Sequence, residues 1–106
     1  MILVTSDDIP GKRIVTTLGL VKGNTVRSRS LAHDVLAFIR SMIGGEVYDY
    51  TKMMAESREQ AVDRMVEEAR RMGANGVTAV RFSIATILQG GSEMLAYGTA
   101  VIIEDE

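Results

Sequence analysis

The sequence predicts a small α+β protein with two layers, in which helices pack on a mostly antiparallel sheet. The strongest observation is the change of period within residues 61–82: apolar residues recur every three or four positions before Gly73 and at alternate positions after Asn75-Gly76. The second observation is the predicted order of elements, which is strand, two helices and hairpin. A chain of 106 residues with 46% hydrophobic residues predicts one domain covering residues 1–106.

A short strand is predicted at residues 2–5, followed by a turn around the only proline, Pro10. Residues 14–21 are apolar or β-branched at both alternating sets of positions, which is typical of a strand covered on two faces. Gly23 is expected to be a bulge, after which the strand resumes over residues 25–27.

Two helices should follow. Ser30 is the predicted N-cap of the first, which ends at Gly44-Gly45. The second begins near Thr51, runs for about six turns and ends at Gly73, where a left-handed residue is expected. An ion pair between Glu67 and Arg71 should support it. Its predicted buried stripe consists of Met54, Ala61, Met65, Ala69 and Met72.

The C-terminal part should be a β-hairpin joined through residues 89–92. The first strand divides into two faces, with Val80, Phe82, Ile84 and Leu88 on one and Ala79, Arg81, Ser83 and Ala85 on the other. The last strand has a face of small residues, Ala96, Gly98 and Ala100, which allows close approach of a helix or a neighbouring backbone. Because neither face of this strand is polar, both should be covered, and a second subunit is the simplest cover.

Composition excludes several classes of function. The chain has no cysteine, so disulfides, thiolate nucleophiles and sulfur-rich metal sites are excluded. Its one histidine, His33, is too few for a catalytic zinc or copper site within one copy. A net charge of −2 gives no bulk attraction to nucleic acid. Neither a membrane-spanning run nor a signal peptide is visible, so a cytoplasmic location is expected.

Short motifs along nearly the whole chain carry a resemblance to a known family. They are Asp8-Ile9-Pro10-Gly11, Leu18-Gly19-Leu20-Val21-Lys22-Gly23, Val26-Arg27, Gly44-Gly45-Glu46, Tyr50-Thr51, Arg58, Arg64-Met65, Glu68-Ala69, Gly73-Ala74-Asn75, Val80-Arg81-Phe82 and Tyr97-Gly98-Thr99-Ala100-Val101. In this order and at this spacing the chain resembles the YbjQ family, which is labelled heavy-metal-binding and whose biochemical role is unknown. The resemblance implies a dodecin-like subunit assembled into a ring, usually a pentamer.

The preferred ligand site is the polar segment that the sequence places between the two helices. Glu46 and Asp49 offer hard oxygen ligands there, and a ring would repeat them around its axis. His33 beside Asp34 pairs an imidazole with a carboxylate, as a metal ligand and its orienting partner do. The cofactor is not identified by the sequence, and a divalent metal ion is the candidate that these ligands suit. The alternative is that Glu46 makes hydrogen bonds that fix the loop or the subunit contact.

Four further residues are candidates for interface or anion contacts: Arg27, Arg81, Tyr50 and Tyr97. Arg81 lies in an apolar strand, so its charge should be paired or face a cavity, and an intersubunit salt bridge is favoured over an anion site. The Tyr97 ring should pack while its hydroxyl finds a partner. The methionines at helical spacing are expected to be core residues and not copper ligands.

Three hypotheses for function remain open. The first is a non-enzymatic homo-oligomer that binds a small ligand or metal ion at subunit interfaces. The second is a structural or partner-binding scaffold without a ligand, in which the polar segments serve assembly. The third is an enzyme whose cleft between subunits collects Arg27, Arg81 and Tyr97. No catalytic residue is predicted, because no nucleophile, base and orienting group can be assembled from the sequence.

Overall fold

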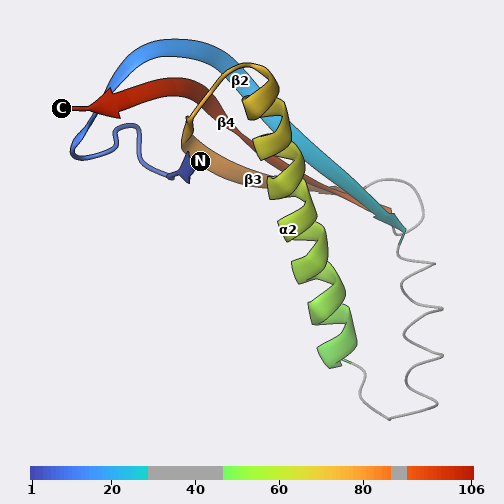
Figure 1. The fold of residues 1–106 in the computed structure, drawn as a ribbon. Helices are drawn as coiled ribbons and strands as arrows, with labels where there is room; N and C mark the ends of the chain where they lie inside the picture. The colour runs from blue at the N-terminus through green and yellow to red at the C-terminus, as the bar shows by residue number, and fades with distance from the viewer. Residues whose placement is uncertain (29–46, 87–90) are drawn as a thin grey trace.

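The computed structural model describes residues 1–28, 47–86 and 91–106 (Figure 1). The predicted first helix and Gly44-Gly45 lie outside these residues. The elements are β1 (Ile2–Leu3), β2 (Lys12–Ser28), α2 (Val47–Arg71), β3 (Gly76–Thr86) and β4 (Gly91–Asp105). Among the residues described, no helix has the length and apolar character needed to cross a membrane.

The strands form one four-stranded sheet in the order β1-β3-β4-β2. Strand β4 pairs antiparallel with both β2 and β3, while the short β1 pairs parallel with β3. The predicted α+β class and mostly antiparallel sheet are thus confirmed. Thr86 pairs with Ser92, as expected of a hairpin whose predicted connection lies largely outside the described residues. Strand β2 is at the edge, and none of the other described strands pairs with its outer side.

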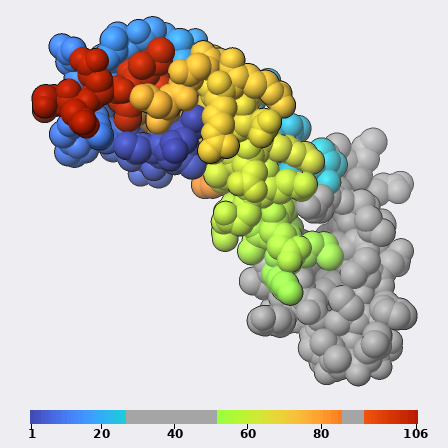
Figure 2. Space-filling model, in the orientation of Figure 1, coloured from blue at the N-terminus to red at the C-terminus, as the bar shows by residue number. Residues whose placement is uncertain are grey.

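Helix α2 packs its predicted apolar stripe on the sheet. Ala61, Met65 and Ala69 are fully buried, and Met54 and Met72 pack against the same cluster. The small side chains of Ala96 and Ala100 lie in this cluster, as the small-residue face of β4 predicted. Burial of a side chain the size of Met65 contributes roughly 1.5–3 kcal/mol. Figure 2 shows the C-terminal part of α2 lying against the strands near the chain ends, while its N-terminal part extends away from them.

The start of α2 differs from the sequence prediction. The helix begins at Val47 and not near Thr51, so Tyr48, Asp49 and Tyr50 belong to its first turn and not to a loop. Threonine is a favoured N-cap residue, and for this reason the sequence predicted a helix start near Thr51. Asp49 is instead well placed inside the first turn, where the positive end of the helix dipole favours a carboxylate.

The end of α2 agrees with the prediction. Gly73 has a φ of 90°, in the left-handed region that costs glycine little. Its N–H donates to the Arg70 carbonyl at 3.0 Å, and the Ala74 N–H donates to the Ala69 carbonyl at 3.0 Å. These two bonds form a Schellman motif, which satisfies the last carbonyls of the helix and turns the chain toward β3.

Strand β2 is irregular, but not at Gly23. The extra residues in its pairing with β4 lie between Ile14 and Thr16 and between Thr17 and Gly19, while Gly23 pairs in register with Ala96. The bulge predicted at Gly23 is therefore wrong. Glycine is required there for another reason: a Cβ on Gly23 would lie 2.2 Å from the Met65 nitrogen, so the backbone of α2 occupies the space of a side chain.

The second face of the sheet is partly covered by the N-terminal segment, residues 4–9, which the sequence analysis did not anticipate. Ile9 is buried with Val101 and Ile103, and Val4 packs against the same cluster. Main-chain hydrogen bonds from Val4 to Val77 (3.0 Å) and from Val80 to Val4 (3.0 Å) hold this segment on β3. A second subunit is not needed to cover this end of β4, although the expectation of apolar faces on both sides was correct there.

Candidate functional site

The predicted metal ligands cannot be assembled within the described part of the chain. His33, Asp34 and Glu46 lie outside it. Asp49 lies in the first turn of α2, but its side chain is not described. Among the described side chains, no group of three or more His, Cys, Asp or Glu residues is arranged to hold a metal ion. The metal site therefore stays a prediction.

Of the four candidates for interface or anion contacts, two have side chains that the structure does not describe. Arg27 takes a register position opposite Ser92, and Tyr50 lies in α2, but the side chains of both are outside the description. Arg81 and Tyr97 are brought together, because they are direct cross-strand partners on β3 and β4. Arg81 and Tyr97 are thus the two predicted contact residues whose described side chains lie next to each other.

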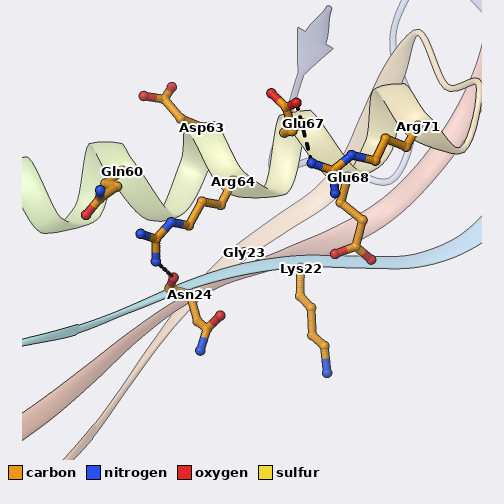
Figure 3. A pocket seen from close by; sticks show the side chains of 9 residues that line it. All are labelled: Lys22, Gly23, Asn24, Gln60, Asp63, Arg64, Glu67, Glu68 and Arg71. Carbon is orange, nitrogen blue, oxygen red and sulfur yellow. Dashed lines mark hydrogen bonds and ion pairs between the residues drawn. The ribbon is translucent and has the colours of Figure 1, made fainter.

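A third residue completes a row across the sheet. Lys22 on β2 is the cross-strand partner of Tyr97 on its other side. Direct cross-strand partners project from the same face of a sheet, about 4.5–5.5 Å apart. Figure 3 shows Lys22 pointing away from α2, so the row lies on the face of the sheet opposite α2. We call Lys22, Tyr97 and Arg81 the cationic row.

The contacts of Arg81 differ from the expectation. Its side chain is exposed in the single copy and is not a buried charge that requires a partner. Its Nη1 atom donates to the Thr5 carbonyl at 2.8 Å and to the Val80 carbonyl at 2.9 Å. The Thr5 bond ties the guanidinium to the N-terminal segment, which lies over the same face. Among the described residues Arg81 makes no ion pair, so the predicted salt bridge stays a prediction about subunit contacts.

Tyr97 and Lys22 also keep unused polar atoms. The Tyr97 ring is half-buried, as predicted, but its hydroxyl makes no hydrogen bond within the part of the chain that the structure describes. Lys22 is exposed and forms no ion pair there. In the sequence Lys22 stood out only as part of the motif Leu18-Gly19-Leu20-Val21-Lys22-Gly23. Its partnership with Tyr97 follows from the two bulges in β2, which set the register and carry no clear signal in the sequence.

A groove of about 550 Å³ runs between α2 and β2 (Figure 3). Arg64 on its helix wall donates from Nη1 to the Asn24 carbonyl at 2.6 Å. Glu67 and Arg71 form the predicted i,i+4 ion pair at 3.5 Å. The charged side chains of α2 along the groove are Asp63, Glu67, Glu68, Arg64 and Arg71, while the Lys22 side chain points away from α2. This near balance of acidic and basic side chains gives the groove no strong preference for an anion or a cation.

The methionines do not form a metal site among the described residues. Met65 and Met94 are buried in the main core, and Met54 and Met72 pack against it. The prediction that the methionines at helical spacing serve packing is confirmed for Met54, Met65 and Met72, while Met42 lies outside the described residues. Soft-metal binding through sulfur therefore has no support here, because cysteine is also absent.

Comparison with known proteins gives the family and the fold. The chain matches the YbjQ_1 family, described as "Putative heavy-metal-binding", over residues 1–104. A UPF0145 protein of Dehalococcoides mccartyi is 49% identical over 104 residues, which cover 98% of this chain and 100% of the relative. A UPF0145 protein of Thermus thermophilus is also 49% identical over 104 residues, covering 98% of this chain and 91% of the relative.

The fold has a match among solved structures. A crystal structure of a protein of unknown function from Pediococcus pentosaceus, described as a member of the DUF74 family, has a TM-score of 0.68 and covers 98% of each chain. Its sequence identity is 15%, so this likeness supports the fold alone. The family match extends over almost the whole chain, and the relatives cover it nearly end to end. The chain therefore belongs to the YbjQ family, a family of unknown function.

Proposed function

We propose that this protein is a homo-oligomer that binds a small ligand or a divalent metal ion between its subunits. The observation that carries the proposal is the large apolar exposure of a single copy on both faces of the sheet. Leu20 and Val26 on the face of β2 opposite α2 are 67% and 56% exposed, and Phe82 and Ile84 on β3 are 46% and 62% exposed. A ring of five copies is the assembly that the family resemblance implies.

The exposed apolar residues of β3 lie next to each other on one face of the sheet, where a second copy would cover them. Phe82 and Ile84 pair with Ala96 and Met94, so they lie on the same face as α2. They stay exposed because α2 packs mainly over β2 and β4 and barely reaches β3. Isolated exposed apolar residues are common, but adjacent ones on a sheet face favour a protein contact. The edge of β2 adds unpaired main-chain groups, which proteins normally cover or protect.

The dimensions of the chain favour the same conclusion. Its Cα radius of gyration is 17.2 Å, with principal extents of 56 × 26 × 20 Å. A compact chain of about 100 residues has a radius of gyration of about 13 Å. A more extended chain buries less of its own apolar surface, so contacts with other copies would supply the missing burial.

The proposed ligand site consists of Glu46 and Asp49, with His33 and Asp34. Their donor atoms are carboxylate oxygens and one imidazole, which suit divalent ions such as zinc or nickel and lack the thiolate that selects soft heavy metals. Asp49 lies at the start of α2, so each subunit would present one such carboxylate. Ligands from neighbouring copies are part of the proposal, because a ring would repeat each of these residues around its axis.

The test is native mass spectrometry of the purified protein before and after adding zinc, copper and nickel separately. The proposal predicts an assembly that retains metal or ligand in whole-number ratios, and loss of that mass in Glu46→Ala. Glu56→Ala is the control, because Glu56 is exposed on α2 and outside the proposed site. The proposal would be contradicted by a monomer, or by an assembly that binds none of the three metals and carries no ligand.

A further inference from the structure

Several polar atoms of the cationic row make no hydrogen bond or ion pair with the described residues. We propose that Lys22, Tyr97 and Arg81 bind the phosphate group of a small phosphate ester on the face of the sheet opposite α2. This proposal does not depend on metal binding. It uses different residues from the site proposed above, and their register is given by β2, β3 and β4.

Within the described strands, the neighbouring rows do not compensate the charge of the cationic row. The neighbouring rows, Leu20 with Thr99 and Thr78 and Asn24 with Leu95 and Ser83, contain no acidic residue. On β4 the closest acidic residue of this face is Glu93, four residues from Tyr97 or roughly 13 Å along a strand. Its carboxylate already accepts a hydrogen bond from the Asn24 amide at 3.1 Å. Two cations therefore face solvent together in a protein whose net charge is −2.

The donors suit a group with several acceptor oxygens. An arginine side chain has five N–H donors, and the two bonds of Arg81 from Nη1 leave Nε and Nη2 unused among the described residues. Lys22 offers three donors and Tyr97 one hydroxyl. A phosphate monoester carries three strong acceptor oxygens and close to two negative charges near neutral pH, so it can engage all three side chains.

The geometry reduces the ordering cost of binding. The row crosses three adjacent strands, so its outer members start about 10 Å apart at the backbone, with Tyr97 between them. The Thr5 and Val80 carbonyls already hold the Arg81 guanidinium, and a side chain that is ordered before binding loses less entropy.

The test is isothermal titration calorimetry with adenosine 5′-monophosphate, inorganic phosphate and adenosine at low ionic strength. The monophosphate should bind, and adenosine should bind at least about tenfold more weakly, because charged hydrogen bonds carry the affinity. Binding of inorganic phosphate as tight as that of the monophosphate would support the phosphate site and identify free phosphate as the ligand. Equal binding of adenosine would overturn it.

Variants test the residues themselves. Lys22→Gln and the double variant Lys22→Gln/Arg81→Gln should raise the dissociation constant of the monophosphate by about tenfold or more, as expected for lost charged contacts. Tyr97→Ala should also weaken binding. Arg70→Gln is the matched control, since it removes the same charge from an exposed position on α2. Lys22→Gln keeps the test valid if loss of the Arg81 contacts to Thr5 prevents folding.

Three outcomes overturn the proposal. One is the absence of binding by any phosphate compound at millimolar concentration. Another is equal weakening by Arg70→Gln, which would show attraction by overall charge. The third is a change in oligomeric mass in Lys22→Gln with the monophosphate affinity per subunit unchanged. That result would make the row a contact between copies and not a ligand site.

Discussion

Gly23 on β2 lies directly against the main chain at Met65 on α2. A Cβ atom on Gly23 would be 2.2 Å from the Met65 nitrogen and 2.3 Å from the Ala61 carbonyl oxygen. Main-chain atoms inside a helix cannot rotate away as a side chain can. The absence of a side chain at Gly23 therefore sets the distance between α2 and the sheet, and with it the packing of Met65, which is fully buried.

Gly23→Ala should destabilise the fold by roughly 3 kcal/mol or more, since overpacking here must displace backbone. Urea unfolding followed by circular dichroism measures the change. Thr17→Ala is the control, because Thr17 is exposed on the same strand and its loss should cost only a few tenths of a kcal/mol. Equal midpoints for both variants would mean that α2 can move off β2 without penalty.

Much of the fold could be predicted because its signals are local and periodic. The stripe of Ala61, Met65 and Ala69 predicted the buried face of α2, and the left-handed Gly73 predicted its end. Gly23 shows where such signals fail. A strand glycine usually indicates a bulge, but here it marks contact with a helix more than thirty residues away in the sequence. Only the tertiary structure distinguishes these two roles.

The candidate site was less predictable because it depends on register. The sequence indicated Arg81 and Tyr97 as separate candidates, but their pairing requires the bulge between Thr78 and Arg81. Ala79 in this bulge has a φ of 54°, a left-handed conformation that is uncommon for alanine and is not predicted by its presence in the sequence. One inserted residue reverses which side chains share a face, so the cationic row could not be derived from alternation alone.

Thr25 and Ser57 form a buried polar contact between β2 and α2. Their hydroxyl oxygens are 2.6 Å apart, and the Thr25 hydroxyl is also 3.2 Å from the Ser57 carbonyl oxygen. Thr25→Val should cost about 1–3 kcal/mol, because it leaves the Ser57 hydroxyl buried without its partner. The double variant Thr25→Val/Ser57→Ala should cost less than the sum of the single variants. Additive losses in urea unfolding would show that the two hydroxyls are not coupled.

The Asp105 carboxylate should titrate below its ordinary range. It accepts a hydrogen bond from the Lys12 ammonium, and this bond, aided by the positive charge, lowers the pKa of Asp105. Because the pKa is depressed in the folded state, the contribution of the pair to stability is present above the unfolded pKa and is lost as pH falls through the folded value. A carbon-13 NMR titration should show the midpoint rise toward its ordinary value in Lys12→Met.

Arg13→Gln is the control for that titration, since Arg13 pairs with Glu104 and not with Asp105. It should leave the Asp105 midpoint nearly unchanged. The same shift in both variants would assign the effect to general positive charge at the start of β2 and not to the Lys12 hydrogen bond. Asp105 is fully exposed, so the expected effect on global stability is small.

Ile84 offers a direct test of the proposed assembly. Its side chain is 62% exposed in one copy, so Ile84→Lys should change the stability of an isolated subunit little. In an oligomer that covers this face, the substitution removes roughly 1.5–3 kcal/mol of apolar burial from each contact and adds an unpaired charge. Light scattering coupled to size-exclusion chromatography should then show a smaller species. Glu106→Lys, at the exposed chain end, should keep the original mass. An unchanged mass for Ile84→Lys would place the subunit contact elsewhere.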